Sequence, residues 1–284
     1  MRAVVPCSSA NLGPGFDALA LALALHVEVT VSEAETFSLT TEGEGSDLPA
    51  DRTHLAARIA IEVRGTDALA IHVRSDIPVG RGLGSSASLA VAAAAAAGST
   101  DALAWGQRID GHPENAAASL LGGLVAATVV AGSPVAARLV LDPGLAFVVL
   151  VPDRTLPTEK ARRALPAMVP LHDAAQNLSR MGVLVAALAD RRLLQPGLMT
   201  DTLHQDARAA ALYPESTALL SGLVAAGAAA SCWSGAGPTL LAVCDGSDVA
   251  AAVRSAGEQL LSEAGLAGRS LVLAPDLDGL RLEA

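Results

Sequence analysis

A glycine-rich segment in the first third of the chain has the residue types of a phosphate site. In Pro78-Val-Gly-Arg-Gly-Leu-Gly-Ser-Ser-Ala87, three glycines precede two serines, and a long alanine-rich run follows. Bare backbone N–H groups beside a helix N-terminus bind anions without needing a lysine. The segment therefore predicts a phosphate site, in which Ser85 and Ser86 add hydroxyl groups for phosphate oxygens or magnesium. The alternative is a turn that needs glycine for backbone geometry alone.

The same glycines also fit the fingerprint of a dinucleotide-binding fold. Gly82-x-Gly84-x-x-Ala87 matches its spacing, and Asp101 follows at the distance that fold requires of its acidic residue. In that fold a strand runs straight into the glycine turn, whereas here the expected strand ends at Arg74. No strand is expected between the following helix and Asp101 either. The spacing therefore disfavours a dinucleotide oxidoreductase.

Two further polar segments interrupt the apolar chain. Pro6-Cys-Ser-Ser-Ala-Asn-Leu-Gly-Pro-Gly-Phe-Asp17 offers an amide at Asn11, which can donate and accept hydrogen bonds, and a carboxylate at Asp17, which suits an amine. A network of Asx turns is the alternative for this segment. Asp110-Gly-His-Pro-Glu-Asn115 places four polar side chains together, and Ser234-Gly-Ala-Gly-Pro-Thr239 forms a flexible loop in the other half.

Composition narrows the function classes. The 284-residue chain is 51% hydrophobic and 2% aromatic, with a formal net charge of −10. So apolar a chain can fold, whereas a nucleic-acid surface needs clustered basic residues and aromatic rings. Of the 19 basic residues only Lys160 is a lysine, and its surroundings match neither a P-loop nor a protein-kinase strand. The sequence therefore excludes lysine-dependent nucleotide folds and a nucleic-acid partner.

Cysteine usage and the apolar stretches indicate a cytoplasmic protein with no membrane partner. Cys7, Cys232 and Cys244 are odd in number and lack CxxC spacing, which disfavours disulfides and a zinc site. The N-terminus is too polar for a signal peptide. Two charge-free stretches, 115–137 and 216–244, contain glycine, proline and hydroxyl residues, so they predict helix–turn–strand pairs in a core.

Hydrophobic periodicity predicts the elements that position these motifs. Strands are expected over 27–31, 37–41, 70–74, 124–130, 146–151, 240–243 and 270–273, and helices over 85–97, 101–109, 115–121, 159–165, 174–194, 215–226 and 249–263. Because strands come first and helices intervene later, the order favours an α+β fold over a doubly wound sheet. We expect two domains, 1–144 and 145–284.

Taken together, four motifs resemble those of the GHMP kinases, and among them the homoserine kinases. The glycine loop is typical of the whole superfamily, whereas the first and third motifs narrow the resemblance to homoserine kinases. The likeness spans residues 6 to 239. In chain order the motifs are Ser9-Ala-Asn-Leu-Gly-Pro-Gly-Phe-Asp17, Arg81-Gly-Leu-Gly-Ser-Ser-Ala87, Gly111-His-Pro-Glu-Asn115 and Ser234-Gly-Ala-Gly-Pro-Thr239.

The resemblance implies a two-domain α+β fold, with a ribosomal-protein-S5-like N-terminal ATP-binding domain and a ferredoxin-like C-terminal domain. It implies ATP-dependent phosphorylation of the hydroxyl of L-homoserine in threonine biosynthesis, with Mg²⁺ as cofactor and a homodimer as the usual assembly. The alternatives are a GHMP kinase for another small alcohol and a non-catalytic ligand sensor on the same fold. Loss of a loop serine or of every acidic metal ligand would favour the sensor, but Ser85, Ser86 and Asp110 are present.

The resemblance also implies roles for individual residues. Ser86 and Asp110 would hold the metal, and Asn115 and Arg162 would act in catalysis. The positions that would surround the ATP phosphates are Pro78, Gly80, Arg81, Gly82, Leu83, Gly84, Ser85 and Ser86. The positions that would bind homoserine are Asn11, Asp17, His112, Asn115, Thr158, Arg162 and Arg208.

Three positions depart from the family pattern. Asp110 stands where Glu is usual, and its carboxylate still supplies oxygen ligands for magnesium with about one methylene less reach. Asn115 stands where related kinases have an Asp base, and an amide cannot accept a proton in that way. The resemblance therefore implies catalysis by alignment and charge stabilisation. His54-Leu55 replaces an Asn-Leu pair that is often found in the adenine region.

Overall fold

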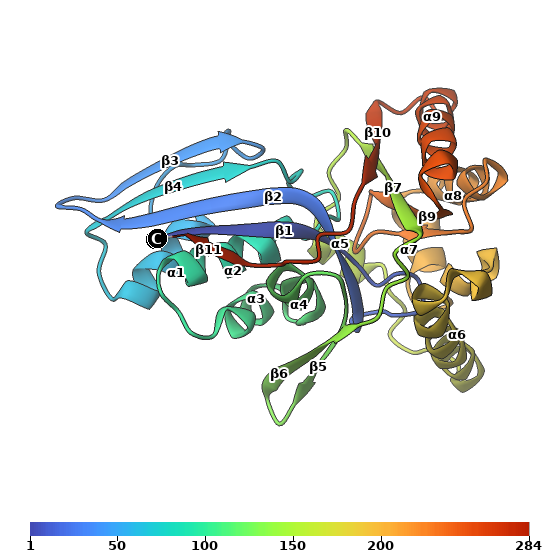
Figure 1. The fold of residues 1–284 in the computed structure, drawn as a ribbon, viewed down its shortest axis with the longest axis horizontal. Coiled ribbons are helices and arrows are strands. Elements are labelled where there is room, and N and C mark those ends of the chain that lie inside the picture. Colours follow the sequence, from blue (N-terminus) through green and yellow to red (C-terminus); the bar gives the residue numbers. More distant parts are fainter. Residues whose placement is uncertain (284) are drawn as a thin grey trace.

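Two β-sheets, one from each half of the chain, organise the molecule (Figure 1). The computed structural model describes residues 1–283. The larger sheet pairs its strands in the order β11-β1-β2-β4-β3, while β5 pairs with β2 and β6 with β5. Only the β3–β4 pair is parallel among the pairings described. Its strands are β1 (Arg2–Ala10), β2 (Leu19–Glu33), β3 (Ser38–Gly43), β4 (Leu69–Ser75), β5 (Leu124–Val130), β6 (Ser133–Leu139) and β11 (Arg281–Glu283).

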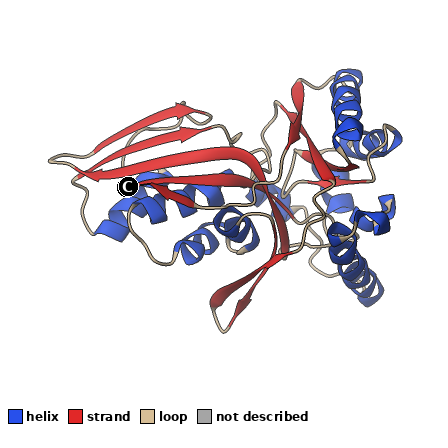
Figure 2. Cartoon of the chain, in the orientation of Figure 1, coloured by secondary structure: helices blue, strands red, loops and turns tan. Residues whose placement is uncertain are grey.

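Four helices lie along one side of the larger sheet (Figure 2). Among them α2 is the most deeply buried, because its alanine-rich sequence combines high helix propensity with side chains small enough for close packing on all sides. Because α2 is packed on all sides, its N-terminus at Ser85 is held in a fixed position. The four helices are α1 (Leu55–Arg64), α2 (Ser85–Ala96), α3 (Ala102–Asp110) and α4 (Glu114–Leu121).

The second sheet is antiparallel and pairs its strands in the order β10-β7-β9-β8. Numbered within this half of the chain, that order is 4-1-3-2, which is the ferredoxin-like arrangement. The two sheets therefore confirm the predicted α+β architecture, with a ferredoxin-like sheet in the second half of the chain. The strands are β7 (Leu145–Pro152), β8 (Ala230–Trp233), β9 (Leu240–Asp245) and β10 (Gly268–Leu273). The helices are α5 (Thr158–Arg163), α6 (Leu171–Ala189), η1 (Arg191–Leu193), η2 (Pro196–Met199), α7 (Gln205–Leu212), α8 (Glu215–Ala225) and α9 (Ser247–Glu263).

The chain passes between the sheets twice. It leaves the larger sheet after β6 and enters the second sheet at β7, so the predicted boundary at Gly144 lies between these two strands. After β10 it returns, and β11 pairs with β1 (Figure 1). The return is held by the His26 imidazole, whose Nε2 lies 2.7 Å from Asp276 Oδ2. The C-terminal segment thus ties the two halves together.

The predicted elements are present, most with small shifts at their ends. The predicted helix 174–194 instead begins at Leu171 and ends at Ala189, where Asp190 is extended and η1 follows. The two charge-free stretches form α4–β5–β6 and α8–β8–β9, as helix–turn–strand arrangements. Within residues 1–283, no helix combines the length and the hydropathy that crossing a bilayer requires.

Candidate active site

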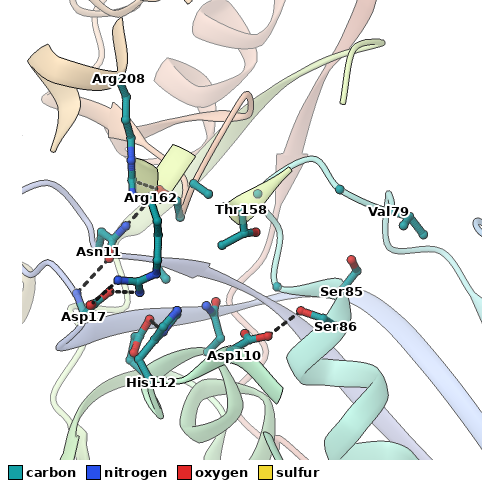
Figure 3. A pocket seen from close by; sticks show the side chains of 18 residues that line it. Asn11, Asp17, Val79, Ser85, Ser86, Asp110, His112, Thr158, Arg162 and Arg208 are labelled. Carbon is teal, nitrogen blue, oxygen red and sulfur yellow. Dashed lines mark hydrogen bonds and ion pairs between the residues drawn. The ribbon is translucent and has the colours of Figure 1, made fainter. Parts of the chain in front are cut away.

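A cavity of about 260 Å³ between the two halves of the molecule gathers most of the predicted site residues (Figure 3). The first half contributes the loop after β1, the start of α2 and the turn between α3 and α4. The second half contributes α5, α7 and the turn after β8. The predicted residues that line it are Asn11, Asp17, Gly80, Gly82, Gly84, Ser85, Ser86, Asp110, His112, Asn115, Thr158, Arg162 and Arg208.

Three residues of the predicted phosphate loop do not line this cavity. Pro78 and Leu83 are buried beneath the loop. The Arg81 guanidinium instead donates to Asp153 Oδ1 at 3.4 Å. The structure therefore places the glycines and serines of this loop at the cavity and directs its larger side chains elsewhere.

The glycine loop meets α2 in a conformation that a side chain would prevent. Gly84 is the N-cap of α2 at φ 66°, and a Cβ there would lie 2.2 Å from Ser8 Oγ. A Cβ on Gly82 would lie 2.4 Å from the carbonyl oxygen of Ser234, in the second half of the molecule. The first amide groups of a helix have no intrahelical partner. This end of the cavity thus presents bare amides and the positive end of a helix dipole, which together suit phosphate.

Ser86 and Asp110 form a pair beside the helix end. Ser86 Oγ donates to Asp110 Oδ1 at 2.7 Å, as Figure 3 shows. Burial raises the pKa of Asp110, against the opposing effects of the Ser86 hydrogen bond and the charge on His112. A buried carboxylate next to a hydroxyl is a fitting donor set for Mg²⁺, which prefers oxygen ligands and compensates the negative charge.

A second group of possible metal ligands lies nearby. One atom each of Asp17, His112 and Glu114 falls within 4.8 Å of the others. Asp17 is already paired with Arg162, and His112 Nδ1 lies 2.5 Å from Glu114 Oε1. Because these charges are matched and imidazole is a poor ligand for magnesium, the Ser86–Asp110 pair fits this ion better.

His112 lies in the wall of the cavity, and its surroundings favour the protonated form of its ring. Burial disfavours charge on its ring, but the close ion-pair contact with Glu114, a fully buried carboxylate, outweighs burial and raises the pKa of His112. The ring lies between Asp17 and Asp110 (Figure 3). A protonated imidazole donates hydrogen bonds and cannot accept a proton. His112 is therefore suited to contact an anionic or hydroxyl oxygen.

Asn11 and Asp17 stabilise a strained loop. Both have positive φ, 72° and 53°, and non-glycine residues with this conformation concentrate at functional sites. Asn11 Oδ1 accepts from the Asp17 backbone N–H, and its Nδ2 donates to the carbonyl oxygen of Gly235, both at 3.0 Å. The Asn11 bond to Asp17 spans six residues and so differs from an Asx turn, and it leaves the Asp17 carboxylate directed at the cavity, where Arg162 meets it.

Two arginines approach the same end of the cavity. Arg162 donates two hydrogen bonds to the Asp17 carboxylate, at 2.8 and 3.1 Å. Arg208 is only 2% exposed, and among the described residues no carboxylate lies within ion-pair distance of it. Burial and the neighbouring charge of Arg162 lower the pKa of Arg208 to about 10, so it stays cationic at neutral pH. A buried cation that faces a cavity without an acid is suited to bind an anion.

Sequence reasoning missed several residues that shape this site. Ser8 Oγ donates to Asn115 Oδ1 at 2.9 Å and so orients that amide. Phe16 stacks on His204, which in turn contacts Arg208. Phe16 and Glu114 lie inside two of the polar motifs, but the sequence analysis assigned neither of them a role in the site. The only signal for His204 is that it precedes Arg208 by four residues, one helical turn.

An adjoining cavity of about 280 Å³ extends the site toward the larger sheet. It shares Val79, Ser85 and Ser86 with the first cavity. Its other lining residues are largely apolar or at strand ends and include Leu48, His54, Leu55, Val73 and Leu89. The two cavities meet at the start of α2, so a molecule with an apolar ring and a phosphate chain could occupy both.

Comparison with known proteins relates the chain to one family. The family described as GHMP kinases N terminal domain matches residues 50–123, and that described as GHMP kinases C terminal matches residues 174–262. Homoserine kinases of Streptomyces avermitilis and Moorella thermoacetica are 42% and 40% identical to the chain, over 91% and 85% of it and 90% and 86% of their own lengths. A solved structure of homoserine kinase from Cytophaga hutchinsonii has a TM-score of 0.84 at 23% identity, covering 99% of this chain and 96% of its own.

Proposed function

Because the chain belongs to the GHMP kinase family, we propose that it transfers the terminal phosphoryl group of ATP to the hydroxyl of L-homoserine. The product would be O-phospho-L-homoserine, and the reaction belongs to threonine biosynthesis. The observation that carries the proposal is one cavity with three complementary parts. These are the helix end at Ser85, the Asp17 carboxylate and the Arg208 guanidinium.

Asp17 and Arg208 account for recognition of a zwitterion. Arg208 would bind the α-carboxylate, since its buried charge has no acid partner among the described residues. Asp17 would accept hydrogen bonds from the α-ammonium while keeping its contact with Arg162. Asn11 and Thr158, which also line the cavity, would contact the remaining polar atoms. Opposite charges at a fixed separation select an amino acid over a neutral alcohol.

ATP would extend across the two connected cavities. Its triphosphate would lie against the glycine loop and the first turn of α2, with Ser85 and Ser86 donating to phosphate oxygens. The adenosine would occupy the more apolar cavity beside His54. The Nδ1 atom of His54 accepts from the backbone N–H of Ala56 at 3.3 Å, and burial lowers the pKa of His54. The neutral ring therefore has its proton on Nε2, as a donor for a ring nitrogen of the base.

Ser86 and Asp110 would hold Mg²⁺. A magnesium ion there supplies charge neutralisation for the phosphates. The hydroxyl and carboxylate oxygens already lie side by side, 2.7 Å apart, at the point where the two cavities meet. Burial raises the pKa of Asp110, and the Ser86 hydrogen bond and the charge on His112 oppose that rise, which favours the ionised carboxylate that a metal ion requires.

Transfer would depend on alignment, because no side chain in the cavity is arranged as a strong base. Asn115 is an amide, the pKa of His112 is raised in favour of the protonated ring, and Asp17 is paired with Arg162. Asn115, oriented by Ser8, would position the substrate hydroxyl in line with the terminal phosphate. Arg162 and His112 would donate to the oxygens on which charge accumulates. Positioning and charge stabilisation account for most of phosphoryl-transfer catalysis.

We also propose that the chain forms a homodimer. Helix α6 leaves Leu171 85% exposed and Leu178 64% exposed. These residues are seven apart, so they lie on one face of the helix. An apolar stripe of this kind supports a surface that a second copy covers. Light scattering of Leu178→Glu against the native chain checks this, since a dimer that uses this face should dissociate.

The reaction is tested by following ADP release with Mg-ATP and a panel of alcohols. Homoserine should be phosphorylated, whereas shikimate, mevalonate and galactose should not raise ADP release above the background rate. Phosphorus NMR of the product should show a phosphate ester of homoserine. ADP release that does not depend on homoserine, or a preference for another alcohol, would overturn the proposal.

A further inference from the structure

The buried guanidinium of Arg208 uses only part of its hydrogen-bonding capacity within the protein. Its Nη1 donates to His204 Nδ1 at 3.1 Å and to the carbonyl oxygen of Gly235 at 2.9 Å. Its Nε donates to the carbonyl oxygen of Ala161 at 3.4 Å. Among the described residues, Nη2 makes no hydrogen bond. The two N–H groups of Nη2 therefore remain for a ligand in the cavity, provided that the other contacts hold the plane of the guanidinium.

His204 is the one side chain among these contacts. An arginine cannot accept a hydrogen bond, so the Nδ1 atom of His204 must carry a lone pair and its proton must be on Nε2. That Nε2 lies 3.0 Å from the carbonyl oxygen of Gly13, to which it donates. Burial lowers the pKa of His204, in keeping with a neutral ring. The ring thus connects Arg208 to the loop that carries Asp17.

The His204 ring is fixed on several sides. It stacks on Phe16, with ring centroids 5.1 Å apart and planes inclined by 29°, and Phe16 directly precedes Asp17. Asp201 Oδ1 accepts from the His204 backbone N–H at 2.7 Å, and Asp201 Oδ2 lies 3.3 Å from Nε2. The side chain is fully buried and does not line the cavity. Its contacts can therefore affect a ligand only through the residues it holds.

We infer that His204 is a positioning residue that fixes the Arg208 guanidinium relative to Asp17, and so sets the separation between the carboxylate and ammonium subsites. This inference rests on the proposed function, because it assigns the two subsites to homoserine. A substrate whose two charges are one carbon apart requires this separation to be held closely. Such a role predicts an effect on homoserine binding and none on ATP binding.

Two substitutions separate the two contacts of the ring. An asparagine at position 204 would place its amide oxygen near the position of Nδ1. His204→Asn therefore retains an acceptor for Arg208, but the shorter side chain does not reach Gly13. Gln places its amide nitrogen near Nε2, so His204→Gln retains the donor to Gly13 and loses the acceptor. The matched control is His172→Gln, because His172 is exposed on α6.

Steady-state kinetics and homoserine titration calorimetry of these variants test the inference. His204→Gln should raise the homoserine KM and Kd about tenfold, as expected for loss of one hydrogen bond to a charged group, with the ATP KM unchanged and kcat within about threefold. His204→Asn should have a homoserine KM and Kd close to the native values, and His172→Gln should have the native values. In an Arg208→Ala background, His204→Gln should add less than about twofold, because coupled residues are not additive.

Several outcomes would overturn the inference. The first is that Arg208→Ala raises the homoserine KM while His204→Gln keeps it within twofold of the native value. Another is that the effects of His204→Gln and Arg208→Ala multiply in the double variant, or that the KM values of both substrates rise together. Should His204→Gln not fold, His204→Leu, which also lacks an acceptor for Arg208, supplies the same comparison with and without Arg208→Ala. If the native chain does not turn over homoserine at all, it is the proposed function that fails.

Discussion

The two ends of the cavity are built in different ways. The phosphate end uses backbone amides, two hydroxyls and a helix N-terminus from one continuous segment, 80–86. The amino-acid end uses charged side chains from segments far apart in the chain, including Asp17, Arg162 and Arg208. A site made of backbone is specified by where side chains must be absent. A site made of side chains is specified by tertiary packing, and it is the end that can be tuned to a particular substrate.

The largest effect should come from adding a methyl group at the phosphate end. In Gly84→Ala the new Cβ would lie 2.2 Å from Ser8 Oγ, at a φ of 66° that favours glycine. Since the start of α2 must move, kcat/KM should fall by more than about 1000-fold, through loss of the anion site. The measurement is steady-state kinetics together with the thermal midpoint.

Gly98→Ala is the matched control for this change. Gly98 also has positive φ, 93°, but a Cβ there has nothing within 4 Å. The substitution should lower the free energy of unfolding by about 1 kcal/mol, because alanine disfavours this backbone conformation. Activity should stay close to that of the native chain. Equal losses of activity in the two variants would show that backbone strain, and not the anion site, causes the effect.

The next largest effect should come from the metal pair. Asp110→Asn keeps the shape of the side chain and a hydrogen-bond acceptor for Ser86, but removes the charge. We expect kcat/KM to fall about 100-fold or more at ordinary magnesium concentrations, with partial recovery as Mg²⁺ is raised. Because burial raises the pKa of Asp110, its charge disfavours the folded state at neutral pH, so the thermal midpoint should not fall. Asp47→Asn, at an exposed site, is the control. Full activity of Asp110→Asn would contradict the metal role.

A change at the amino-acid end should separate the two substrates. Arg208→Ala removes the unpaired cation, and we expect the homoserine KM to rise about 100-fold, with the ATP KM within about threefold of native. Arg163→Ala, at an exposed position on α5 where the arginine pairs with Glu159, should leave both constants unchanged. A rise of the ATP KM equal to that for homoserine would erase the distinction between the two ends.

The smallest effect should come from the only lysine. Lys160 is exposed on α5 and does not line the cavity. Since the phosphate end is made of amides, hydroxyls and a helix dipole, Lys160→Ala should keep kcat/KM within about twofold of native. A loss comparable to that of Gly84→Ala would mean that a lysine does bind phosphate here. The assay is the same steady-state kinetics.

The difference between the two ends also explains what the sequence could predict. The phosphate end is local, so the glycines, Ser85, Ser86 and the helix that follows were all predictable from one segment. The helix itself, predicted over 85–97, spans Ser85–Ala96. At the amino-acid end, the resemblance supplied Asp17, Arg162 and Arg208, but their contacts depend on the fold. Nothing in the sequence indicates that Arg162 pairs with Asp17 or that His204 contacts Arg208.

Several strands and helices that the sequence analysis did not predict lack a recognisable sequence pattern, for physical reasons. The first part of β2 alternates Leu and Ala and is buried on both faces, so it lacks the apolar–polar alternation that marked 27–31. Helix α7 buries Gln205 and Arg208, whose polarity conceals the amphipathic pattern of a short helix. Strands β8 and β11 are very short and are defined by their pairing partners. Helix α1 did carry a signal, because apolar residues recur at helical spacing and Gly65 ends it.

The claim that opposite charges at the amino-acid end select a zwitterion is tested most directly by removing one charge from the substrate. The measurement is kcat/KM for L-homoserine, for 4-hydroxybutanoate, which lacks the ammonium, and for 3-aminopropan-1-ol, which lacks the carboxylate. For both analogues kcat/KM should be at least about 100-fold lower than for homoserine, because each analogue leaves a charged side chain of the cavity unpaired. In Arg208→Ala, the difference between homoserine and 3-aminopropan-1-ol should nearly disappear. Turnover of either analogue by the native chain at the homoserine rate would contradict the account.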